Sequence, residues 1–126
     1  MNNICTSIEQ SKKLVELCID VNTADMCYCP IMNIDSGNNE GYLKTPECYS
    51  FSEFKNFAVP YLPAWSLSAL LDLMPNVNGH YPELCRGKQT GQYYMWIENT
   101  FDTQMFDNPI DAAFEMVCWL LENNKI

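Results

Sequence analysis

Apolar residues recur at helical spacing in three stretches of the chain, most clearly in the C-terminal DNPIDAAFEMVCWLLENNKI. Asn108 can cap a helix there, Pro109 suits its first position, and Asp111 would lie in the first turn, where the helix dipole favours an anion. Apolar residues recur three and four positions apart, which predicts one buried face. That face consists of Ile110, Ala113, Phe114, Val117, Leu120 and Leu121.

A second helix is predicted near the N-terminus, over about residues 7–20. Thr6 and Glu9 have the spacing of a capping box at its start. Ser7 and Gln10 have the same spacing, so the pattern leaves both pairs open. The apolar positions form one stripe, which predicts a surface helix with a single buried side. That stripe consists of Ile8, Val15, Cys18 and Ile19, with Leu14 at its edge.

The third stretch is YLPAWSLSALLDLMP, residues 61–75, which predicts a two-turn helix that begins after Ser66. Serine is a good N-cap, and Trp65 and Leu70 then occupy the two positions of a hydrophobic staple. Pro75 ends the helix one residue earlier, because the residue before a proline avoids the helical region. A site with Ser66 or Ser68 as nucleophile and Trp65 as a ligand platform is the alternative, but every feature of the stretch has a structural role in such a helix.

Strands are predicted between the helices. Residues 24–31 form a short strand that Pro30 places at an edge or an end of a sheet. The first half of residues 33–50 is rich in Asn, Asp, Ser and Gly, which indicates a loop or a loose hairpin. Residues 92–98 are aromatic and favour a strand. They form a hairpin with the weaker strand YPELCRG, through the loop GKQTG.

The order of elements is therefore helix, strand, loop, helix, hairpin, helix. It predicts an α+β fold in which three main helices pack on one face of a small antiparallel or mixed sheet. The chain shows no internal repeat and no linker, and its 126 residues are close to the commonest size of one domain. We therefore expect a single domain over residues 1–126.

Charge narrows the classes of partner. Seven basic residues against sixteen acidic ones give a net charge of −9. Nucleic-acid binding requires Lys and Arg against phosphate, so direct binding of DNA or RNA is disfavoured. Anionic membrane surfaces are disfavoured for the same reason. No apolar segment reaches the ~18 residues of a membrane span. The simplest interpretation is that the negative charge keeps the protein soluble. The more specific interpretation is that it attracts a basic protein partner.

Cysteine usage indicates the compartment. The chain has seven cysteines, an odd number, and the N-terminal MNNICTSIEQSKK has no signal-peptide pattern. We therefore expect a cytoplasmic protein whose thiols stay reduced and serve mostly as small packing residues.

No catalytic or metal constellation is apparent. His80 is the single histidine, and Cys27 and Cys29 have C-x-C spacing, which is a poor match to the C-x₂₋₄-C pairs of zinc sites. Cys85 and His80 could form a nucleophile and base, but no motif places either at a strained elbow. We predict no catalytic residue, no metal and no cofactor.

Candidate binding residues lie in the C-terminal part. Asp107, Asp111 and Glu115 follow helical spacing and could line one acidic face, although a solvated helix face is the commoner outcome. Trp119 and Tyr93 are candidate anchors for a partner, as are their neighbours Trp96 and Tyr94, because Trp and Tyr dominate binding hot spots. The alternative is that these rings fill the core.

Three segments carry a resemblance: SKKLVELCIDVNTADMCY, LPAWSLSALLDLMP and DNPIDAAFEMVCWLLENNKI. They resemble a group of small proteins of anaerobic gut bacteria, often encoded beside prophage or other mobile-element genes. The shared signature is P-x-W-S-L-S-x-L-L-x-L-x-P with a C-terminal P-I-D-A helix, and residues 32–60 are the least alike. The resemblance implies an intracellular bacterial or phage origin. It brings no activity, ligand or catalytic residue with it.

These observations favour a small acidic soluble interaction or accessory protein, of a mobile element or prophage, rather than an enzyme. Its partner would be another protein, and association with a second copy is also open. One alternative is a small-molecule-binding protein or minor enzyme with an aromatic pocket near His80. Another is an anti-defence protein that mimics DNA through Asp107, Asp111 and Glu115.

Overall fold

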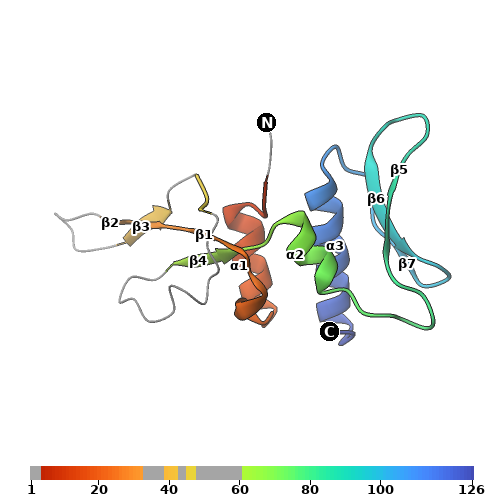
Figure 1. Cartoon of the computed structure of the whole chain (residues 1–126), viewed down its shortest axis with the longest axis horizontal. Coiled ribbons are helices and arrows are strands. Elements are labelled where there is room, and N and C mark those ends of the chain that lie inside the picture. Colours follow the sequence, from red (N-terminus) through yellow and green to blue (C-terminus); the bar gives the residue numbers. More distant parts are fainter. Residues whose placement is uncertain (1–3, 33–38, 43–44, 48–60) are drawn as a thin grey trace. The chain divides into compact units, whose positions relative to one another are not determined.

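The computed structural model describes residues 4–32, 39–42, 45–47 and 61–126. The chain divides into two compact units: an N-terminal unit within Cys5–Ser66, and a C-terminal unit of Leu67–Ile126 together with Ile4. The α-helices of the described residues are α1 (Ile8–Glu16), α2 (Leu67–Asp72) and α3 (Pro109–Glu122), and a short 3₁₀ helix spans Val21–Thr23 (Figure 1). Helices and antiparallel strands occur together, so the predicted α+β class is confirmed. The single domain over residues 1–126 stays a prediction.

The N-terminal unit is built on two short strand pairs. Strand β1 (Met26–Tyr28) pairs antiparallel with β4 (Leu62–Ala64), and β2 (Pro30–Met32) pairs antiparallel with β3 (Asn39–Tyr42). Helix α1 packs against β4. The strand predicted over residues 24–31 is thus two strands that separate at Cys29. The core beneath them contains Cys5, Met26, Tyr28, Leu62 and Ala64.

Helix α1 is shorter than predicted. The Ser7–Gln10 pair forms the capping box, and Leu17 is the C-cap. Cys18 follows with φ of +65°, outside the helix, and is exposed. The predicted stripe is therefore wrong in part. The buried positions of α1 are Ser11 and Leu14, whereas Val15 is 40% exposed.

The C-terminal unit is a three-stranded antiparallel sheet covered on one side by α3 (Figure 1). Its strands are β5 (Glu83–Arg86), β6 (Tyr93–Ile97) and β7 (Phe101–Asp102), with β6 in the centre. Helix α3 packs against β6 and β5, and α2 packs against α3. Asn108 caps α3 and Pro109 opens it, as predicted. The β5–β6 hairpin is also confirmed, while β7 was not predicted.

The finer fold prediction, three helices on one face of one sheet, is not confirmed. The described strands form three small sheets, and α1 contacts β4 whereas α3 contacts β5 and β6. Within the described ranges, no helix combines the length and the apolar character that crossing a membrane requires.

Candidate functional site

The two faces of the C-terminal sheet differ in burial. Met95 and Ile97 of β6 are fully buried, and α3 packs on this strand. Phe101, the register partner of Ile97, stacks on Trp119 of α3, with ring centroids 4.8 Å apart. Successive side chains of a strand point to opposite faces. Tyr94 and Trp96, both half-buried, therefore lie on the face opposite α3.

Strand register defines the residues of this second face. Glu83 of β5, Trp96 of β6 and Asp102 of β7 are Cα partners in one row across the sheet. Cys85 and Tyr94 are partners in the next row. Directly opposed side chains have Cβ atoms ~5 Å apart, so each row forms a contiguous patch. We call these five residues the Trp96 face.

The Trp96 face is aromatic and acidic. Trp96 is flanked across the sheet by the carboxylates of Glu83 and Asp102, both on exposed residues. The Coulomb interaction with Cys85, a hydrogen bond with the same side chain, partial burial and the charge of Asp102 together raise the pKa of Tyr94. The Trp96 indole nitrogen is buried and has no hydrogen-bond partner in the described part of the chain. The part of this ring that solvent reaches is therefore its carbon surface.

A hollow of about 410 Å³ adjoins the Trp96 face. It is lined by Trp96, Asn99, Thr100, Phe101 and Asp102, so it lies at the turn between β6 and β7. The turn is tight, with Asn99 in the left-handed region at φ of +58° and Thr100 N–H donating to the Ile97 carbonyl at 3.0 Å.

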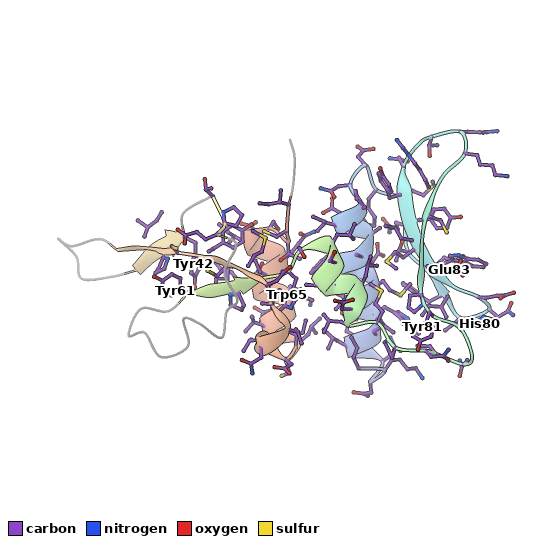
Figure 2. All side chains as sticks on the ribbon, viewed as in Figure 1. Tyr42, Tyr61, Trp65, His80, Tyr81 and Glu83 are labelled. Carbon is purple, nitrogen blue, oxygen red and sulfur yellow. The ribbon has the colours of Figure 1, made fainter. Side chains whose placement is uncertain are left out.

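His80 lies in the segment that leads into β5. Its Nδ1 is 3.3 Å from Glu98 Oε2, and both side chains are about half exposed. In Figure 2 the labelled His80, Tyr81 and Glu83 follow one another along this segment. Cys85 has Tyr94 as its cross-strand partner instead. Among the described residues, His80 and Cys85 thus have separate partners, Glu98 and Tyr94.

Two of the predicted binding residues lie together at the other end of β6. Tyr93 pairs with Phe106 through two backbone hydrogen bonds, of 2.6 and 2.7 Å. Asp107 is next along the chain and accepts a 3.0 Å hydrogen bond from Gln92 Nε2. The Arg86 guanidinium lies over the Tyr93 ring, 5.2 Å from its centroid. Tyr93 and Asp107 are therefore already engaged within the unit.

The other three predicted residues follow one another on α3 at four-residue spacing, which places them on one side of the helix. Asp111 is in the first turn and half-buried, and Trp119 is half-buried against Phe101. Glu115 has a buried carboxylate oxygen with no partner among the described residues. These residues do not form a uniformly exposed acidic row.

The N-terminal unit holds a smaller group of titratable side chains, Cys29, Glu47 and Tyr61. Burial raises the pKa of the Cys29 thiol, and the Glu47 carboxylate adds to the effect. Burial and the nearby Cys29, Cys27 and Glu47 raise the pKa of Tyr61. Across the described ranges, no three His, Cys, Asp or Glu side chains are grouped so as to hold a metal ion.

Sequence reasoning missed the acidic partners of Trp96. Glu83 and Asp102 stand out only once the register of three strands is known, and the two-residue β7 is too short to give a pattern. The alternation in YYMWI was the available signal. It places Tyr94 and Trp96 opposite the apolar Met95 and Ile97.

Comparison of the chain with protein-family models, curated proteins and solved structures gave no match. The resemblance to small proteins of gut bacteria and their mobile elements therefore stays a prediction. Any statement about function has to rest on the chemistry of the faces described above.

Proposed function

We propose that this protein is a small acidic interaction module whose Trp96 face binds a basic segment of a partner protein. The observation that carries the proposal is the row Glu83–Trp96–Asp102, in which an indole lies between two carboxylates. A cationic side chain placed over the indole would be attracted by the ring and by both carboxylates. Tryptophan and tyrosine are also the residues that most often anchor protein interfaces.

The charge of the whole chain supports the same partner class. A net charge of −9 attracts basic surfaces and repels nucleic acids and anionic membranes. None of the six described cysteines is in a disulfide, and reduced thiols are usual in the cytoplasm. An accessory role in a mobile element rests on the sequence resemblance alone.

A peptide-selection experiment tests the proposal. The full chain is immobilised and exposed to a random peptide library at low salt. We expect the retained peptides to be enriched in Arg and Lys. We expect release at about 1 M salt, where the Debye length falls to about 3 Å. Enrichment of acidic or purely apolar peptides would contradict the proposal.

Variants locate the binding surface. Trp96→Ala and Asp102→Asn should each reduce retention of the basic peptides by roughly tenfold, the loss of about 1.4 kcal/mol. Asp72→Asn on α2 is the matched control, since it removes the same charge from an exposed position outside the sheet. Equal retention by all three variants would show that the Trp96 face is not involved. Light scattering on the same samples measures whether the face associates with a second copy instead.

A small-molecule-binding role is the second candidate, and the hollow at the β6–β7 turn is the observation that favours it. A ligand selective for the folded state raises the unfolding midpoint. A metabolite that raises the midpoint of the wild type but not of Trp96→Ala would support this role. A midpoint raised only by basic peptides supports the interaction module.

The DNA-mimic hypothesis makes a separate prediction about Asp107, Asp111 and Glu115. Of these only Asp107 is exposed, whereas Asp111 and Glu115 are half-buried, so they offer little reachable charge to a protein that binds phosphates. Replacing all three by their amides should leave retention of basic peptides within about twofold of wild type, because none belongs to the Trp96 face. A complete loss of peptide retention would show that the binding surface includes these residues of α3 and its N-terminal flank.

A further inference from the structure

The hollow at the β6–β7 turn adjoins the Trp96 face. Its volume is about 410 Å³, and much of it is open to solvent. Two of its lining residues, Trp96 and Asp102, are register partners on the face itself. A group that binds the face can therefore extend into the hollow.

The walls of the hollow are held by contacts within the C-terminal unit. The Thr100 hydroxyl donates to the Glu98 carbonyl at 3.1 Å, which fixes the turn. Phe101 stacks on Trp119 of α3 with an angle of 9° between the rings, which holds this residue in place at the start of β7. A site whose walls are already in place loses little conformational entropy when it is filled.

The lining chemistry favours a cation with several donors. Asp102 supplies a carboxylate, Asn99 a side-chain carbonyl, and Thr100 the lone pairs of a hydroxyl whose proton is already donated. Trp96 supplies aromatic surface. The lining contains no Lys or Arg, so nothing on it would repel a positive charge.

We propose that the hollow receives an arginine side chain of the basic partner, an inference that rests on the proposed function. A guanidinium is planar, carries five donors in a rigid fork, and stacks on aromatic rings while it pairs with a carboxylate. An indole beside a carboxylate, Trp96 beside Asp102, offers both interactions. A lysine ammonium is a compact and strongly hydrated charge that cannot stack, so it fits the same lining less well.

The sheet already holds one guanidinium in this manner. Arg86 lies over the ring of Tyr93, and its Nε donates to the Gly91 carbonyl at 2.9 Å. Arg86 is thereby held at the start of β6, the end away from the β6–β7 turn. An arginine in the hollow would repeat this stacking at the other end of β6, next to the β6–β7 turn. The carboxylate of Asp102 would then take the place of the Gly91 carbonyl.

Three short peptides test the inference: acetyl-Gly-Ser-Arg-Ser-Gly-amide and its lysine and citrulline versions, titrated into the ¹⁵N-labelled full chain. Citrulline has the shape of arginine without its charge. We expect the arginine peptide to shift the indole resonance of Trp96, identified with Trp96→Phe, and the backbone resonances of Asn99 and Asp102. Its Kd should be in the millimolar range, roughly tenfold below that of the lysine peptide.

Asp102→Asn should weaken the arginine peptide about tenfold, while Asp72→Asn should leave its Kd unchanged. The amide spectrum of each variant reports whether it is folded. A lysine or citrulline peptide that binds as tightly as arginine, shifts confined to residues outside the hollow, or no saturable shift would each overturn the inference. If the library experiment still selects basic peptides through Trp96, the proposed function survives that failure. If it selects none, both fall.

Discussion

Thr6 and Tyr28 show how single residues hold the N-terminal unit together. Thr6 is fully buried, and its hydroxyl accepts from the Trp65 backbone N–H at 3.1 Å and pairs with Ser11 at 2.8 Å. The Tyr28 hydroxyl donates to the Thr6 carbonyl at 2.7 Å. The hydroxyls of Thr6, Ser11 and Tyr28 thus all have partners, which avoids the cost of about 1–3 kcal/mol for an unpaired buried group. These contacts tie α1 to the chain that follows β4.

The buried hydroxyl of Tyr28 makes stability depend on alkaline pH. Burial, a hydrogen bond with Cys5 and the charges of Cys5 and Glu9 raise the pKa of Tyr28 far above its ordinary value. The unfolded chain then loses this proton at about pH 10 while the folded chain keeps it. The contribution of Tyr28 to the free energy of unfolding is therefore fully present below about pH 10. It falls as the pH rises beyond this value, by up to about 1.4 kcal/mol per pH unit.

Tyr28→Phe should remove this contribution to the slope. Urea unfolding between about pH 8 and pH 11 measures it. We expect the variant to be less stable by about 1 kcal/mol at pH 8, because the hydrogen bond to Thr6 is lost, and to lose less stability than wild type at higher pH. Tyr81→Phe is the control for a phenol that is 64% exposed. An alkaline slope identical in Tyr28→Phe and wild type would contradict the assignment.

Trp65 and Ser66 have hydrogen-bond partners that the local sequence could not predict. The stretch YLPAW predicts only an entry to a helix, yet residues 62–64 form β4 and Trp65 donates its indole N–H to Thr23 at 2.9 Å. The Ser66 N–H and hydroxyl both donate to the carboxylate of Asp25. Such partners lie about forty residues away in the sequence, so no local pattern could reveal them. The proposed staple of Trp65 with Leu70 stays a prediction.

At the scale of elements, α3 is the best-predicted part of the chain because its signals are local. The cap, the proline and the apolar spacing all lie within the segment itself. The Asn108 side chain accepts from the Ile110 N–H at 2.8 Å. Strand β7 and the α1 boundary were missed for the opposite reason. A two-residue strand has no periodicity, and the end of α1 depends on the left-handed conformation of Cys18.

Asn108→Ala should destabilise α3 by about 1 kcal/mol, since alanine cannot accept the hydrogen bond that closes the first turn. Asn108→Ser is the matched variant, because serine retains a capping oxygen and should restore most of the loss. The measurement is the free energy of unfolding in urea at neutral pH. Equal losses in the two variants would mean that the side chain at this position does not act as a cap.

The site also depends on the arrangement of elements. The hairpin and the alternation of β6 are readable from the sequence, and they assign Tyr94 and Trp96 to one face. The acidic character of that face is not readable, because Glu83 and Asp102 are separated from Trp96 by turns and meet it only through strand register. The predicted binding residues Trp119 and Glu115 lie on α3, where Trp119 stacks on Phe101 and Glu115 buries a carboxylate oxygen.

For the whole molecule, the open question is whether the two compact units unfold together. Each contains roughly sixty residues, and a domain of that size buries only about 60% of its unfolded surface and is marginally stable alone. Domain boundaries usually fall in flexible linkers, yet here the fully buried Trp65 and the hydrogen-bonded Ser66 directly precede α2. We therefore predict one cooperative transition for the full chain.

Urea titration followed by amide resonances distinguishes the outcomes, with Met26 and Tyr28 reporting on the N-terminal unit and Met95 and Val117 on the C-terminal unit. Coincident midpoints are expected. Asn108→Ala sharpens the comparison, because its substitution lies in the C-terminal unit alone. In a single cooperative domain it lowers both sets of midpoints by the same amount. If only the resonances of Met95 and Val117 move, the units unfold independently and the single-domain prediction is wrong.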